Sequence, residues 1–189
     1  MKPLSKAGTS WIVVTVIALA AGLVSLPPAS VTADEKSKKS ETTAQDASVN
    51  RTRKTVHMLD DLYKTAIVLI TKNYVEDESS TPAASAAVAL WETMEKKGWH
   101  KVRLVDATGD PYDVDNVPKT DFEKRAIKKL NAKNAYFDQV VTEDGKRYLE
   151  AVTYVPVVMD KCVLCHPNYA DVPKGATIGA VSYRLPIEE

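Results

Sequence analysis

The sequence predicts an α+β fold in which two helices precede an antiparallel sheet. Apolar residues recur with a helical period over 53–75, and a second helical segment follows over 81–97. After residue 100 the pattern changes to short alternating segments, and the sequence EDGK at 143–146 is a strong hairpin signal. Helices grouped ahead of hairpin-linked strands are typical of α+β folds.

Residues 1–33 predict an export signal. Lys2 and Lys6 precede an apolar run over 11–26, and VTA at 31–33 fits a small-residue cleavage site. The run has 16 residues, which is short for a bilayer span of about 20 residues. We therefore expect a periplasmic protein. The alternative is an uncleaved anchor, the one case in which the chain would contact a membrane.

The mature chain is expected to begin with a disordered tether over 34–52, because almost no apolar residue lies there. The domain then spans 53–189. Its first helix, 53–75, has one broad apolar face, formed by Val56, Leu59, Leu62, Tyr63, Ala66, Ile67, Leu69, Ile70 and Tyr74. His57 lies opposite this face, and Met58 lies at its edge.

Local capping and turn signals predict the remaining elements. Thr81 and Pro82 open the second helix, and Gly98 ends it. The sequence TDFE at 120–123 is a capping box for a short helix to about residue 131. Strands are expected over 101–107, 136–142, 147–158 and 177–185. We expect a small PAS-like antiparallel sheet, with the long N-terminal helix and the second helix packed beside it.

The charge balance excludes one class of partner. The chain has 25 Lys and Arg against 25 Asp and Glu, so its formal net charge is zero. Loss of the signal segment would remove two lysines and leave the mature chain slightly acidic. Proteins that hold nucleic acid carry a basic surplus, so we expect no nucleic-acid partner.

Both cysteines lie in one pentapeptide, CVLCH at 162–166. This Cys-x-x-Cys-His pattern is the attachment motif of c-type haem. Cys162 and Cys165 can form thioethers with the two vinyl groups on one porphyrin edge, and His166 is then the proximal iron ligand. The sequence therefore predicts one covalently attached haem c.

Three other interpretations of the motif fit less well. A thioredoxin-like redox pair needs a βαβ context, which is missing before Cys162. A zinc site needs further ligands, and His57 and His100 do not have ligand spacing. A small disulfide loop needs no following histidine.

Several segments resemble a family of haem-c, PAS-like periplasmic domains of bacteria. They are LDDLYKTA at 59–66, GDPYDVDNVP at 109–118, TDFE at 120–123, PVVM at 156–159, CVLCH at 162–166 and GAVSY at 179–183. Together they span about 53–187, and Asp113 stands where the family usually has asparagine. The resemblance implies a PAS-like fold and a single haem. It also implies a second iron ligand from the N-terminal helix, or an open site.

The second axial ligand is left with several candidates. No third cysteine exists, so a thiolate is excluded. Met58 is the preferred residue because it borders the apolar face of the first helix; an open site and His57 follow. Met94, His100 and Met159 are weaker candidates, since Met159 is too close in sequence to Cys162 to reach the opposite haem face.

These features predict a haem-binding module without enzymatic activity, because no acid–base constellation can be recognised. The preferred function is a redox or gas-ligand sensor; the alternative is a small periplasmic electron-transfer cytochrome. Its partners would be haem and either a diatomic gas or a redox protein, and pairing of two chains through the first helix is left open. Arg103, Arg147 and Arg184 are candidates for binding the haem propionates.

Overall fold

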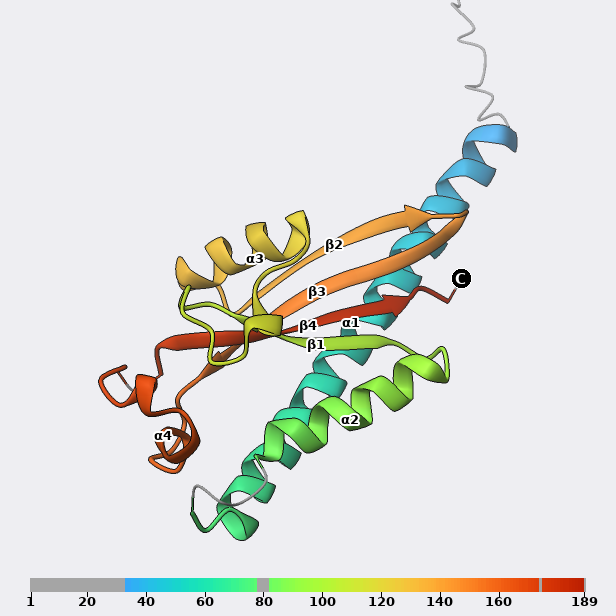
Figure 1. Cartoon of the computed structure of the whole chain (residues 1–189). Coiled ribbons are helices and arrows are strands. Elements are labelled where there is room, and N and C mark those ends of the chain that lie inside the picture. The colour runs from blue at the N-terminus through green and yellow to red at the C-terminus, as the bar shows by residue number, and fades with distance from the viewer. Residues whose placement is uncertain (1–32, 78–81, 174, 189) are drawn as a thin grey trace, which may run out of the picture.

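The computed structural model describes residues 33–77, 82–173 and 175–188. Its centre is an antiparallel sheet with the spatial order β1 (Lys101–Asp106), β4 (Thr177–Pro186), β3 (Lys146–Pro156) and β2 (Tyr136–Glu143). The helices α1 (Ala33–Tyr74) and α2 (Ala83–Lys96) lie along one face of this sheet, and α3 (Asp121–Asn131) lies on the other (Figure 1). The predicted α+β class, with a long helix and a second helix beside it, is confirmed.

The helix α1 begins at Ala33, so the segment predicted to be a disordered tether over 34–52 is helical instead. Ser48, Val49 and Thr52 are buried, and the guanidinium of Arg51 donates to the carbonyl of Glu188 at 3.3 Å. Most of these contact residues are small or polar, so they leave no apolar period in the sequence. The apolar period of the sequence therefore predicts a helix start that is too late.

The predicted export segment lies outside the described residues, except for Ala33. Within the described part of the chain, no helix combines the length and apolar composition needed to cross a membrane.

Alternating side chains of the strands form two separate cores on the two faces of the sheet. On the α1 and α2 side, Tyr183 and Leu149 pack with Trp91 and Tyr63. On the α3 side, a smaller cluster packs together, made of Val105, Phe122, Ala126, Leu130, Val152 and Ala180. Because strand side chains alternate between the faces, this arrangement fills both sides of the sheet with protein side chains.

The buried face of α1 is narrower than its sequence pattern predicts. Val56 and Tyr63 are buried, whereas Leu62 is 58% exposed, Leu69 52% and Tyr74 77%. The sheet and α2 contact α1 along one stripe only, so apolar residues at the sides of the predicted face remain exposed.

Most of the local signals correspond to the elements they predicted. Asp144 and Gly145 both have positive φ angles at the β2–β3 turn, which is the conformation of a tight hairpin. Thr120 and Glu123 form the predicted capping box of α3. The strand β3 ends at Pro156, two residues early, where its register with β4 shifts. Thr81 lies outside the described residues, and Pro82 occupies the N-cap position of α2.

Candidate functional site

The Cys-x-x-Cys-His motif lies in a long connection between two neighbouring strands. The strands β3 and β4 pair directly, and antiparallel neighbours can be joined by as few as two residues. Here the described residues of the 157–176 connection leave the sheet instead, and they form α4 (Cys162–Cys165) and the 3₁₀ turn η2 (Pro167–Tyr169). A connection of this length in a small domain is typically functional.

The single turn α4 presents the predicted attachment residues. Cys162 and Cys165 are three positions apart in α4, and residues with this spacing are neighbours on a helix surface. Cys162 is half-buried and forms no disulfide with the described residues. The side chain of Cys165 is not among those that the structure describes. The attachment of both thiols to one porphyrin edge therefore stays a prediction.

The amino group of Lys161 fixes this segment to the end of α1. It donates to the carbonyl oxygens of Lys72 at 3.1 Å and Val75 at 2.7 Å. These carbonyls belong to the last turn of α1 and the residue after it, where backbone acceptors lack helical partners. The motif is therefore held beside the C-terminal end of α1, beyond the ends of the strands (Figure 1).

The ring of His166 lies between two tyrosines. Tyr112 meets it edge-on, with 5.1 Å between ring centroids and an interplanar angle of 81°. Tyr169 stacks on it at 5.2 Å and 27°. Tyr169 is itself buried, and burial, followed by the charge of Asp106, raises the pKa of its hydroxyl. Tyr169 therefore stays protonated and uncharged near neutral pH.

The state of His166 suits a metal ligand. Burial lowers the pKa of its imidazole, so the ring is neutral near pH 7, and neutral imidazole is the ligating form. Its Nδ1 atom is buried and has no hydrogen-bond partner among the described residues. If His166 holds an iron, it would do so through Nε2, because Nδ1 is buried.

The surroundings of the motif also fit a large apolar group. Tyr112 is 69% exposed and Val158 is 44% exposed, and Tyr74 lies exposed at the end of α1 to which Lys161 is bonded. These side chains are available to contact a bound apolar group. The residues present therefore fit a haem whose iron is bound by His166.

The candidates for the second axial ligand are widely separated. Met58 is 59% exposed on α1, and Lys72, which Lys161 contacts, lies 14 residues further along the same helix. At 1.5 Å per residue this separation is about 21 Å along the axis. The structure therefore does not bring Met58 together with the His166 segment, and its assignment remains a prediction without a supporting contact.

The other candidates are placed as follows. The ring of His57 packs on Tyr136 of β2, with centroids 4.7 Å apart. His100 shares a 2.8 Å hydrogen bond with the hydroxyl of Tyr63, in the α1–α2 region. Met159 alone shares a segment with the motif, since its carbonyl accepts from the amide of Cys162 at 3.0 Å. Met94 lies half-buried on α2.

Arg103 and Arg184, which were predicted to bind propionates, pair with carboxylates of the protein. Arg184 pairs with Glu150 at 2.9 Å and with Glu143. Arg103 pairs with Glu123 at 2.7 Å. Because their guanidinium groups are already engaged by carboxylates, neither Arg103 nor Arg184 is free for a haem propionate.

Sequence reasoning missed the residues that surround and position His166. The motif and the apolar periodicity predict no role at the site for Tyr112, Lys161 or Tyr169. The sequence does contain a signal for each tyrosine. Tyr169 follows the motif within a Pro-containing turn, and Tyr112 lies in the loop shared with the resembling family. For Lys161 the sequence has no signal, because its partners are backbone carbonyls 86 and 89 positions away.

The fold and the site together define an α+β domain that carries a Cys-x-x-Cys-His motif beyond the end of its sheet. The family model described as Tll0287-like matches residues 28–185. The chain therefore belongs to the Tll0287-like family, which confirms the resemblance found in the sequence.

A solved structure described as that of the cyanobacterial heme-protein Tll0287 has a similar fold, with a TM-score of 0.50 and 16% sequence identity. The match covers 74% of this chain and 97% of that chain. No curated protein matches the sequence.

Proposed function

We propose that this protein is a monohaem c-type cytochrome domain that acts as a redox or gas-ligand sensor. The observation that carries the proposal is the Cys-x-x-Cys-His motif on α4, with a neutral His166 whose Nδ1 is buried. The similar fold of a protein described as a heme-protein adds support.

Each role follows from the chemistry of the residues. The thiols of Cys162 and Cys165 would each add across one vinyl group, forming an S–C bond while the proton goes to the other vinyl carbon. His166 would bind the iron through Nε2 as the proximal ligand. The bound haem would supply reversible one-electron chemistry or a binding position for a diatomic gas.

Export to the periplasm is part of the same proposal. Residues 1–33 have the charged start, apolar run and small-residue site of a signal peptide. Membrane contact would arise only if this segment were retained.

The link between the motif and α1 favours a sensor. Lys161, next to Cys162, is bonded to the end of α1, and α1 runs along the sheet and beyond it (Figure 1). A change at the haem would therefore act on the end of a 42-residue helix. The exposed position of Met58 supports an open or exchangeable second axial site, as a gas sensor requires.

The alternative is a small electron-transfer cytochrome. The high exposure of Tyr112 beside His166 favours it, because a haem near exposed aromatic groups is accessible to a redox partner. In both cases we propose a binding module rather than an enzyme.

We also propose that two chains pair through α1. Met58, Leu62 and Leu69 are exposed, and their spacings of four and seven residues place them on one stripe of the helix.

Absorption spectroscopy of the purified protein tests the proposal. Alkaline pyridine should give a c-type haemochrome with one haem per chain, and the double variant Cys162→Ser, Cys165→Ser should give none. CO should bind to the reduced protein if the second site is open. A methionine-to-iron charge-transfer band without CO binding would instead support the electron carrier. If the unaltered protein gives no haemochrome, the haem assignment fails.

A further inference from the structure

Tyr112 is too exposed for burial to fix the position of its side chain. The residue is 69% exposed, yet its ring makes an edge contact with His166 at 5.1 Å. It lies in the connection between β1 and α3, which is mostly irregular apart from the 3₁₀ turn η1 (Val114–Asn116). An exposed tyrosine in an irregular loop adopts many positions unless the adjacent backbone is fixed.

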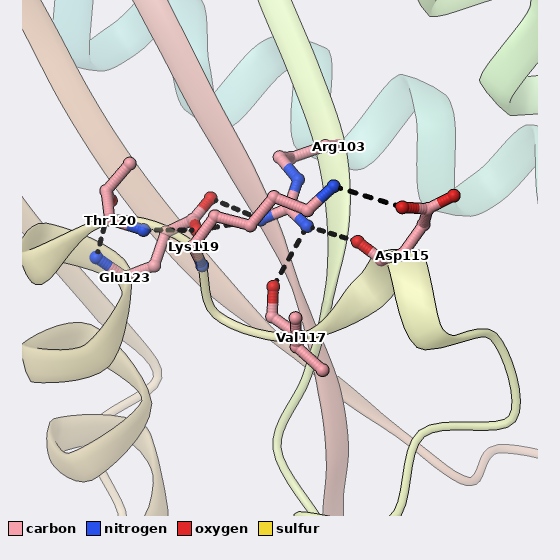
Figure 2. A network of polar contacts seen from close by, with 6 residues as sticks. All are labelled: Arg103, Asp115, Val117, Lys119, Thr120 and Glu123. Carbon is pink, nitrogen blue, oxygen red and sulfur yellow. Dashed lines mark hydrogen bonds and ion pairs between the residues drawn. The ribbon is translucent and has the colours of Figure 1, made fainter.

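Arg103 fixes that backbone. Its Nη1 atom donates to both carboxylate oxygens of Glu123 at 2.7 Å. Its Nη2 atom donates to the carbonyl oxygens of Asp115 at 2.7 Å and Val117 at 3.1 Å. Figure 2 shows the guanidinium between the start of α3 and η1. One side chain of β1 therefore holds both η1 and the residue that follows it.

Glu123 makes the anchor rigid. Its side chain is 4% exposed, and Oε2 also accepts from the backbone amides of Lys119 at 2.7 Å and Thr120 at 3.2 Å. Burial alone would raise the pKa of this carboxyl, but the bonds from Arg103 and the two amides outweigh it and lower the pKa. The carboxylate is thus ionised and fully bonded, which fixes the guanidinium in turn.

The anchor continues to Tyr112 through a short stretch of backbone. The amide of Asp115 donates to Oδ1 of Asp113 at 2.9 Å, and the amide of Asn116 donates to the carbonyl of Asp113 at 2.9 Å. Asp113 is the residue next to Tyr112. The chain of contacts therefore runs from Arg103 through η1 and Asp113 to Tyr112 and His166.

We propose that Arg103 is a positioning residue for the haem site, which acts by holding Tyr112 against the ring of the proximal ligand His166. The proposal rests on haem binding at His166 as proposed above. The orientation and surroundings of an axial ligand tune the reduction potential of the iron. Arg103 thus sets the potential through geometry, whereas its charge is balanced locally by Glu123.

Variants at Arg103 and Tyr112 separate this role from the alternatives. Arg103→Gln removes both the forked guanidinium group and its positive charge. Arg103→Lys keeps the charge, but a lysine ammonium cannot bond all four acceptors at once. Arg53→Gln is a matched control. It breaks another arginine–carboxylate pair, Arg53 with Asp138 at 2.7 Å, which joins α1 to β2.

The first measurement is the midpoint potential of the haem-loaded proteins, with pyridine haemochrome recorded to show that haem is retained. Arg103→Gln, Arg103→Lys and Tyr112→Ala should shift the potential in the same direction and by a similar amount. The double variant Arg103→Gln, Tyr112→Ala should match Tyr112→Ala alone, and Arg53→Gln should match the unaltered protein.

Two results would overturn the proposal. If Arg103→Lys restores the potential of the unaltered protein, the charge rather than the geometry acts on the iron. If Arg103→Gln still shifts the potential in a Tyr112→Ala background, the effect does not pass through Tyr112. A complete lack of haem in the unaltered protein would instead refute the proposed function, so the two failures are distinguishable.

The second measurement needs no haem. In the Cys162→Ser, Cys165→Ser chain, nuclear Overhauser contacts between the rings of Tyr112 and His166 should be present. Arg103→Gln and Arg103→Lys should abolish them, and Arg53→Gln should keep them. Retention of these contacts in both Arg103 variants would contradict the positioning role.

Discussion

Asp60 is the central acceptor between α1 and the sheet, so its removal should destabilise the fold strongly. Its Oδ1 atom accepts from the hydroxyls of Thr153 at 2.6 Å and Tyr183 at 2.9 Å. Its Oδ2 atom accepts from the ammonium of Lys64 at 3.0 Å. Tyr183 is 1% exposed and Thr153 is 4% exposed, so water cannot readily replace the lost acceptor.

The expected magnitude follows from these partners. Asp60→Ala leaves two buried hydroxyls without their acceptor, at about 1–3 kcal/mol each. Lys64 keeps a 2.7 Å bond to the carbonyl of Tyr154 and is partly exposed, so it adds little. We expect the free energy of unfolding to fall by about 2–6 kcal/mol. Asp60→Asn keeps one accepting oxygen and should have an intermediate effect.

Urea unfolding followed by circular dichroism measures this effect. The matched control is Asp61→Ala, since Asp61 is the exposed neighbour in α1 and should change the free energy of unfolding by no more than about 0.5 kcal/mol. The reasoning is refuted if Asp60→Ala costs less than about 1 kcal/mol at an unchanged denaturant slope. A double variant with Tyr183→Phe should be less destabilised than the sum of the single variants, because both remove the same bond.

Three further predictions concern separate parts of the molecule. The lowered pKa of Glu123 means that this carboxylate stabilises the fold above its unfolded pKa of about 4.3, and that this contribution is lost as pH falls through the lower folded pKa. Glu123→Gln should therefore flatten the acid limb of a stability–pH curve, and an unchanged limb would contradict the assignment. Lys161→Met should speed amide exchange in the last turn of α1 by roughly tenfold, as expected for loss of about 1–2 kcal/mol of local bonding, whereas the exposed Lys72→Met should not. Leu62→Glu together with Leu69→Glu should shift the mass measured by analytical ultracentrifugation from dimer to monomer, and a monomeric unaltered protein would refute pairing through α1.

The sequence predicted those parts of the fold that depend on local chemistry. The capping box at Thr120 and Glu123 and the turn at Asp144 and Gly145 lie where their residue types placed them. Both signals work through bonds or φ angles within four residues, so they can be recognised without knowledge of the rest of the chain.

Features that depend on tertiary contacts could not be predicted in the same way. The N-terminal half of α1 has little apolar content, and its contact with the domain comes from Ser48, Val49 and Thr52. Met58 fits the edge of a helical apolar face in the sequence, but the sheet covers a different stripe of α1 and leaves it 59% exposed. Periodicity shows which residues share a face, and only the fold shows which stripe of that face is covered.

The position of the motif explains why a covalent haem suits this domain. Both faces of the sheet are already filled, by Tyr183 and its neighbours on one side and by Phe122 and its neighbours on the other. A haem held by His166 would therefore sit at the end of the sheet rather than in either core. Fewer apolar side chains can surround it at the end of the sheet. Burial contributes about 25 cal/mol per Å² of apolar surface, so a partly exposed site retains a free haem weakly. The proposed thioethers from Cys162 and Cys165 would remove that requirement. Tyr112 and Tyr169 would then orient the axial ligand rather than retain the cofactor.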